Sequence, residues 1–438
     1  IEFYHKINEQ PSLDDKLLKG IELTDTDLKF YPGTEWQKSA WKLDRILSSH
    51  QLLLIALARF VVEGNEVYIL RGNHDLELFW PQVQDRFRQL VSTHYPAGYT
   101  YQDTKAAVAA RIHFLPWFYF ERDLLYVEHG HQYDPFCSNA HNLCPVLPEN
   151  RQQLELALSA FSMRYFVAQI LHVDPAAMEN INSIPKYLLQ LIRGNLRQVL
   201  QLPLYYLEMV ARTNRKVRQV QSHLELPIQE EEAKVREEIK AAYGLTDKAL
   251  HAIERLTHRP VLLNRWETIK CFSLDLLLAG IVALVVGVGL SLTVPTLPWR
   301  WAPLSISVFV IGVLVLLGKV RVSKFNNHRN LRGIARTIRD ATGSRYVVFG
   351  HSHDPDAYPL SPSKDQWYFN VGTWVPRRSN GQFVYLQIVR EEANASVHLM
   401  RWDRRQQQPV ELELASYTKG TAQRKAMLKK EVRSARRP

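Results

Sequence analysis

The stretches Gly72-Asn73-His74-Asp75 and Gly350-His351-Ser352-His353 decide the fold class of this chain. Each follows a short apolar run, Val67–Leu70 before the first and Tyr346–Phe349 before the second. A third stretch, Glu128-His129-Gly130-His131, follows the apolar residues 124–127. A buried strand that ends in glycine and polar residues places their side chains at the carboxyl edge of a sheet, where α/β proteins carry their chemistry. The three stretches therefore predict an α/β fold with imidazoles and an amide at a metal site.

The cysteine content gives weaker information. The chain has 438 residues and three cysteines, Cys137, Cys144 and Cys271, too few for a disulfide scaffold, which favours a reducing compartment. Cys137 and Cys144 flank His141 and suggest zinc. A fourth ligand is missing, however, and the spacing fits no common zinc module, so we expect ordinary helix or loop residues there.

The apolar pattern divides the chain into five segments. Residues 1–136 alternate between helical and strand patterns, which predicts the first part of a layered α/β domain. Residues 137–270 are dominated by amphipathic helical stretches and predict a helical insertion. Strand patterns return within residues 321–415, the expected second part of the domain. The strands expected besides those named above are residues 111–120, 367–371, 383–389 and 396–401.

Residues 271–320 carry a membrane signal. No residue between Asp275 and Arg300 is charged, and residues 301–318 are again free of charge. Each run is long enough, or nearly so, for the roughly 20 helical residues that cross a hydrocarbon core. Two such neighbouring runs are rare in soluble domains, so we expect a two-helix transmembrane hairpin rather than a buried hairpin in a soluble core.

The charges beside these runs predict the orientation. Many Lys and Arg residues lie before and after the hairpin, whereas its connecting loop has only Arg300. The positive-inside rule then predicts a multi-pass membrane protein whose catalytic domain lies on the cytoplasmic side. The tail, residues 416–438, has eight Lys or Arg residues and one acid, Glu431, within a chain of net charge +11. Such a tail suits an anionic lipid surface or nucleic acid.

The three polar stretches resemble the late motifs of the calcineurin-like metallophosphoesterase family, which are GNH[DE], a strand-end His and GHxH. The resemblance covers about residues 1–136 and 340–400. It implies a four-layer α/β/β/α sandwich, here interrupted by the helical insertion and the membrane hairpin. It also implies two divalent metal ions, with manganese expected first and iron, zinc or nickel as alternatives, because imidazole, carboxylate and amide ligands suit these metals.

Roles carried over from the family fall on individual residues. The resemblance assigns one metal ion to Asn73, His129 and His351, and the other to His353. It makes His74 the group that contacts the phosphate and protonates the leaving oxygen.

Three further residues have roles around these ligands. The resemblance implies that Asp75 orients His74 by a hydrogen bond. His131 is either a supporting residue or a replacement for the Asp of the UDP-2,3-diacylglucosamine pyrophosphatase-like branch. Asp134 is the candidate to orient His131.

Two early motifs of the family, Asp-x-His and Gly-Asp-x-x-[Asp/Glu], are not found in this sequence. Ile1-Glu2-Phe3 is similar to the end of the second motif, with Glu2 as its closing acid. We therefore expect the chain to begin just after that motif. In that case this segment holds three ligands for one metal ion and one for the other, and is nearly inactive alone.

These patterns predict a membrane-anchored, metal-dependent phosphoesterase that hydrolyses a phosphate ester or pyrophosphate by two-metal hydroxide attack. The expected partners are the lipid bilayer and a phosphate-containing substrate, and the hairpin favours a lipid-linked one. A nuclease of the same metal class is one alternative, but the excess charge lies where lipid explains it equally well. A non-catalytic membrane scaffold is the other alternative. The sequence does not indicate the substrate or the oligomeric state.

Overall fold

The computed structural model describes residues 23–30, 32–167, 204, 207–213, 215, 226–271, 274–293, 301–324, 328–363, 365–374, 383–391 and 394–413. Within these residues the chain is a mixed α/β protein with sheets of two, three and five strands, so the expected fold class is confirmed at that level. Glu2 and the basic tail lie outside the described residues, as does most of 168–225.

The five-stranded sheet is the central element, with strand order β3-β4-β5-β7-β6. Its inner strand β5 has the sequence YVVF and is buried along its whole length. Parallel pairing sets Glu128 of β4 opposite Phe349 of β5, and Phe349 opposite Asn370 of β7. The carboxyl ends of three strands therefore meet at one edge. The strands are β3 (Phe118–Glu121), β4 (Leu125–Glu128), β5 (Tyr346–Phe349), β6 (Asp356–Pro359) and β7 (Trp367–Asn370).

Helices cover one face of the central sheet. They are α11 (Leu226–Tyr243), α12 (Asp247–Glu254) and α16 (His328–Thr342). In α16 the buried residues Leu331, Ile334, Ala335 and Ile338 recur with the spacing of one helix face, and they pack with Val347 and Phe349 of β5. Burial of one of these leucine or isoleucine side chains stabilises the fold by about 1.5–3 kcal/mol.

A second sheet covers the other face. It consists of β8 (Val384–Glu391), β9 (Asn394–Asp403) and β10 (Gln408–Glu411), in the order β10-β9-β8. Val384 and Leu399 pack against Tyr346, Val348 and Phe369 of the central sheet. The layers around the central sheet are thus helix, sheet and sheet. The four-layer sandwich stays a prediction.

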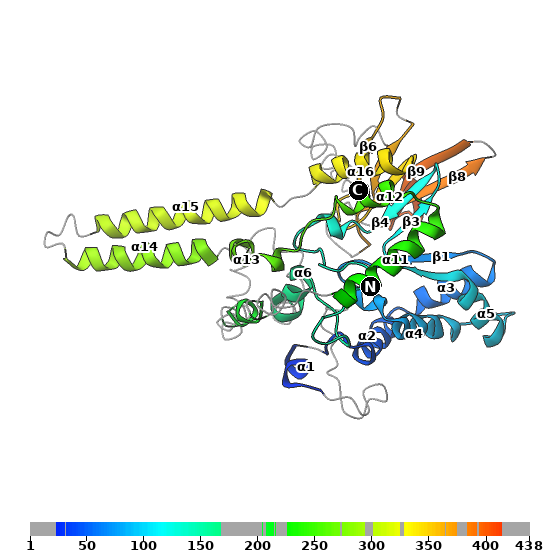
Figure 1. The fold of residues 1–438 in the computed structure, drawn as a ribbon, viewed down its shortest axis with the longest axis horizontal. Helices are drawn as coiled ribbons and strands as arrows, with labels where there is room; N and C mark the ends of the chain where they lie inside the picture. Colours follow the sequence, from blue (N-terminus) through cyan, green and yellow to red (C-terminus); the bar gives the residue numbers. More distant parts are fainter. Residues whose placement is uncertain are drawn as a thin grey trace.

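A smaller βα unit carries the first polar stretch. Strands β1 (Val67–Leu70) and β2 (Ile112–Leu115) pair in parallel, and a cluster of buried apolar side chains joins them to four helices. Figure 1 shows these helices together on one side of the molecule. Helix α4 has proline at its first position, and α5 begins with a capping box of Thr100 and Asp103. The helices are α2 (Trp36–Ser48), α3 (Gln51–Val62), α4 (Pro81–Ser92) and α5 (Tyr101–Arg111).

The expected insertion is only partly helical where the structure describes it. Residues 137–157 form turns and one isolated bridge between Val146 and Leu154. A short helix, α6 (Leu158–Ser162), follows and continues as a π-helix, Met163–Val167. Helices α11, α12 and α13 (Arg265–Cys271) follow later in the chain.

Helices α14 (Leu274–Thr293) and α15 (Ala302–Lys324) pack against each other and project away from the rest of the molecule (Figure 1). Their apolar side chains are exposed; Val285 is 65% accessible, Leu292 68% and Phe309 73%. By length and composition, no single helix within the described residues qualifies to cross a bilayer, and the apolar stretches here are Ala279–Thr293 and Ala302–Leu314. Helices α2 and α3, which meet at 95°, qualify only as a bent pair. The transmembrane hairpin stays a prediction.

Candidate metal centre

Five histidines lie close together, and each follows the carboxyl end of one of three strands. His74 follows β1, His129 and His131 follow β4, and His351 and His353 follow β5. The ring centroid of His129 lies 5.0 Å from that of His131 and 5.3 Å from that of His351. His74 and His353 are also close enough to act electrostatically on His129. The structure thus brings together the four histidines to which the family resemblance assigns metal or acid roles.

Gly72 sets the distance between the first and second polar stretches. A Cβ atom added at Gly72 would lie 2.7 Å from both Cδ2 and Nε2 of the His129 ring. Such a distance is far inside a normal carbon contact of about 3.5–4.0 Å. Glycine is therefore required here because the imidazole packs directly on the backbone.

The turn after β1 is fixed from two sides. The backbone N–H of Gly72 donates to Oδ1 of Asp75 at 2.6 Å. Two residues further on, Glu77 accepts from Nζ of Lys42 at 2.7 Å, and both side chains of this ion pair are almost wholly buried. These contacts hold the turn that carries Asn73 and His74. The expected bond from Asp75 to His74 stays a prediction.

Asn73 has an acceptor without a partner. The residue is only 4% exposed, and its Nδ2 donates a long hydrogen bond of 3.4 Å to Oγ of Ser159. Its Oδ1 is buried and has no hydrogen-bond partner among the described residues. A buried polar atom left in this state destabilises a fold by about 1–3 kcal/mol. An amide oxygen is also a common ligand of divalent cations, so this atom fits a metal site.

The backbone of the third polar stretch is strained. His351 has a φ of 62° and His353 a φ of 57°, in the left-handed region that residues other than glycine rarely adopt. Each such residue destabilises the fold by about 1–3 kcal/mol, and strain of this kind clusters at functional sites. Asn370 supports the turn, because its Nδ2 donates to the carbonyl of Gly350 at 2.6 Å.

The electrostatics keep the central imidazoles neutral. Burial lowers the pKa of His129 well below 6.5, and the neighbouring histidines lower it further. Burial likewise lowers the pKa of His131, with added repulsion from His351 and Arg71. Burial also lowers the pKa of Arg71 to about 10. Neutral imidazoles offer lone pairs, which is the form that binds metal ions.

Asp134 contacts a different histidine from the one expected. Its Oδ2 lies 3.1 Å from Nε2 of His351. His131 instead has its Nδ1 3.2 Å from Nδ1 of His129, and its Nε2 3.0 Å from the amide nitrogen of Gln132. Burial pushes the pKa of Asp134 up, but hydrogen bonds led by that from His351 outweigh it and hold the pKa below its usual value.

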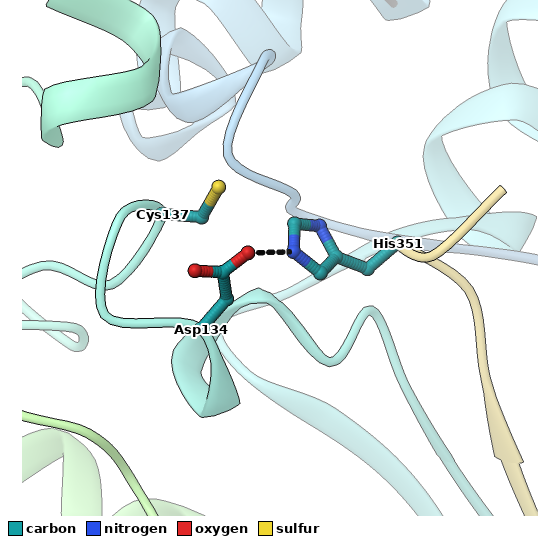
Figure 2. A group of neighbouring side chains, drawn as sticks. All are labelled: Asp134, Cys137 and His351. Carbon is teal, nitrogen blue, oxygen red and sulfur yellow. Dashed lines mark hydrogen bonds and ion pairs between the residues drawn. The ribbon is translucent and has the colours of Figure 1, made fainter. Parts of the chain in front are cut away.

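Cys137 lies near His351 and Asp134, and its expected role as an ordinary loop residue stays a prediction. Figure 2 shows Asp134 and Cys137 on one loop, with the carboxylate of Asp134 directed at the ring of His351 on another segment. One potential ligand atom from each of the three lies within 4.8 Å of the others. Cys144 and His141, the other two residues of the suggested zinc cluster, contact acidic side chains instead. Sγ of Cys144 donates to Glu231 at 3.1 Å, and Nδ1 of His141 lies 2.9 Å from Glu232.

Sequence reasoning also missed Ser159 and Asn370. Ser159 contacts Asn73 from α6, in a segment whose place relative to β1 no local pattern reveals. Asn370 had a usable signal, because it ends the strand β7 beside β5 and so reaches the same sheet edge. Glu2 lies outside the described residues. Comparison with models of known protein families, with curated proteins and with solved structures gives no match to this chain.

Proposed function

We propose that this protein is a metal-dependent phosphoesterase anchored at a membrane. The observation that carries the proposal is the buried, unpartnered Oδ1 of Asn73 beside a group of histidines kept neutral by their surroundings. An acceptor in that position destabilises the fold unless a cation or a donor completes it. The left-handed φ values of His351 and His353 also support a functional site, because backbone strain of this kind clusters at such sites.

The proposed ligands are those implied by the resemblance to calcineurin-like metallophosphoesterases. Asn73, His129 and His351 would hold one divalent cation, and His353 would contribute to a second. When bound, two such cations supply a hydroxide near neutral pH and neutralise charge on the phosphoryl oxygens. His74 then contacts the phosphate and gives its proton to the leaving oxygen. The four-layer α/β/β/α sandwich belongs to the same proposal.

A pocket lined in part by residues of α6 suits a phosphate-containing substrate. It has a volume of about 320 Å³, and its charged lining residues are Arg164, Arg212, Arg215 and one acid, Glu149. Arg164 and Arg212 also pair with the acids Asp27 and Glu208, at 3.3 Å and 2.9 Å. The apolar lining consists of Leu147, Leu154, Leu156 and Phe161. Phe161 lies on α6 two residues after Ser159, which contacts Asn73.

A membrane anchor is supported by the apolar surface of α14 and α15. Apolar surface that projects into water is unfavourable at about 25 cal/mol per Å². A bilayer removes that penalty, and the basic residues beside both helices favour the cytoplasmic side. Alkaline carbonate extraction of membranes tests the anchor. The protein is expected to remain in the pellet, and its release would refute the anchor while leaving the hydrolase proposal intact.

The decisive experiment measures metal content and turnover of the full-length protein together. Nucleotides, sugar nucleotides and lipid phosphates are supplied with manganese, and the variant His74→Ala is compared with His94→Ala. His94 caps the end of α4, where its Nδ1 lies 2.8 Å from the carbonyl of Leu90, so it serves as a matched control. We expect His74→Ala to lose most turnover but keep its metal, and His94→Ala to keep both.

Two results would overturn the proposal. Absence of bound metal in the intact protein would leave the non-catalytic scaffold as the better reading. Turnover of nucleic acid alone, with steep salt dependence of binding, would indicate the nuclease.

A further inference from the structure

The loop after β4 presents two potential metal ligands that lie outside the polar stretches. Asp134 is directed at the ring of His351, and Cys137 lies on the same loop as Asp134 (Figure 2). The ligand atoms of the three side chains lie within 4.8 Å of one another. Cys137 is 7% exposed, so its thiol faces the protein interior and not water. A carboxylate, a thiol and an imidazole form a donor set that binds zinc-class ions.

The loop holds these two side chains in a fixed relation. The backbone N–H groups of Cys137 and Ser138 both donate to the carbonyl of Asp134, at 2.9 and 2.8 Å. The N–H of Phe136 donates to Oδ1 of the same residue at 2.9 Å. The turn is also tied to the segment before α13, because the N–H of Val261 donates to the carbonyl of Pro135 at 3.0 Å. These hydrogen bonds fix Asp134 and Cys137 relative to each other in the loop.

A second observation points to a cation at this place. The Cys137 thiol lies close enough to the side chains of Ser159 and Asp134 to interact with both. The hydroxyl of Ser159 also accepts from Asn73, whose buried Oδ1 has no partner among the described residues. The unpartnered oxygen and the Asp134, Cys137 and His351 group are thus joined through one serine.

The distances agree with a shared ion. Two ligand atoms of a tetrahedral zinc, each about 2.0–2.3 Å from the metal, are separated by about 3.4 Å. The 3.1 Å between Nε2 of His351 and Oδ2 of Asp134 is close to that value. The same distance is that of a hydrogen bond, which holds the two side chains together in the metal-free protein.

We propose that Asp134 and the thiolate of Cys137 join His351 as ligands of a zinc-class divalent ion. The proposal rests on the proposed function only in that His351 is a metal ligand. The Cys137 thiol releases its proton to solvent as the ion enters, and the Cys137–metal bond replaces the S–H bond. Thiolate selects zinc over manganese, so the ion nearest His351 is zinc-class, whereas the sequence favoured manganese.

Cobalt(II) spectroscopy tests the thiolate directly. The full-length protein is stripped with a chelator and titrated with Co²⁺, and the near-ultraviolet sulfur-to-cobalt band is recorded. We expect the band in the natural protein and in Cys144→Ser, and its loss in Cys137→Ser. Cys144 is the matched control, because it is also a buried free cysteine and contacts an acid. Zinc affinity should fall in Cys137→Ser by more than the about 10–100-fold typical of a residue that only supports a ligand.

A second variant keeps the test independent of how well Cys137→Ser folds. The chain has three cysteines, so Cys144→Ser/Cys271→Ser leaves Cys137 alone, and it must retain the band. Loss of the band there, or its persistence in Cys137→Ser, overturns the thiolate ligand. Cobalt absorption without a sulfur band refutes this inference but leaves the proposed metal function standing. Absence of any cobalt binding refutes both.

Discussion

Replacement of Gly72 by alanine offers a sharp test of the candidate metal centre. The new Cβ would lie 2.7 Å from two atoms of the His129 ring. Restoring a normal contact of about 3.5–4.0 Å requires the ring to move by about 0.8–1.3 Å. Overpacking of this kind destabilises a fold by about 1–3 kcal/mol. A shift of about 1 Å in a site can lower its activity about 100-fold.

We therefore expect Gly72→Ala to remain folded, with an unfolding free energy lower by about 1–3 kcal/mol. Its metal affinity and turnover should fall on the order of 100-fold. Urea denaturation measures the first quantity, and calorimetric metal titration with turnover measures the second. The full-length protein is used throughout.

Gly333→Ala is the matched control. Gly333 lies in α16, and a Cβ added there meets no atom within 4 Å. Alanine in a helix at such a position is expected to stabilise the fold by about 0.4–1 kcal/mol and to leave metal binding unchanged. If Gly72→Ala binds metal as tightly as the natural protein and is equally stable, the His129 ring does not lie against Gly72 and the reasoning fails.

Three further changes test other parts of the structure. Asn73→Ala removes the unpartnered Oδ1, so the metal-free variant should be at least as stable as the metal-free natural protein in a denaturation assay with chelator. Its metal affinity should fall at least about 10-fold in a metal titration. A clear loss of stability in the metal-free variant would contradict this expectation. Lys42→Met removes the Lys42 ammonium from the buried carboxylate of Glu77 and should lower the unfolding free energy by about 3–5 kcal/mol. The double variant Lys42→Met/Glu77→Leu should recover most of that loss in the same denaturation assay, and equal losses in both variants would argue against the ion pair. Because the pKa values of His129 and His131 are depressed in the fold, the unfolded chain binds protons first as pH falls below 6.5. Metal-free protein should then lose stability by up to about 2.7 kcal/mol per pH unit from the two residues, and a flat profile between pH 7 and 5 would refute neutral imidazoles.

The strands were predictable because their signals are local. The expected strands 67–70 and 346–349 agree with β1 and β5. Residues 111–120 form two strands, β2 and β3, and these belong to different sheets. Pro116 lies between them and cannot donate to a ladder, so a break was foreseeable. The assignment of β2 and β3 to two different sheets was not foreseeable, because it depends on packing partners that are distant in the sequence.

The site was predictable to a similar degree. Its histidines follow strands, and parallel strands bring their carboxyl ends together, so local pattern places these residues at one edge. The contacts of Asp134, Cys137 and Ser159 depend on a turn and on an irregular segment with no repeating pattern. The position of such a segment relative to the sheet depends on tertiary packing, and the periodicity of apolar residues does not predict it.

The pairing of β4 with β5 imposes an order on biosynthesis. Asp134 and His351 touch although 217 positions separate them in the chain. At about 5–20 residues per second, a ribosome needs roughly 10–40 s to pass from one to the other. The nascent protein exposes the edge of β4 and an incomplete cluster of imidazoles throughout that interval. The proposed cation would therefore find its full set of ligands only after β5 has emerged from the ribosome.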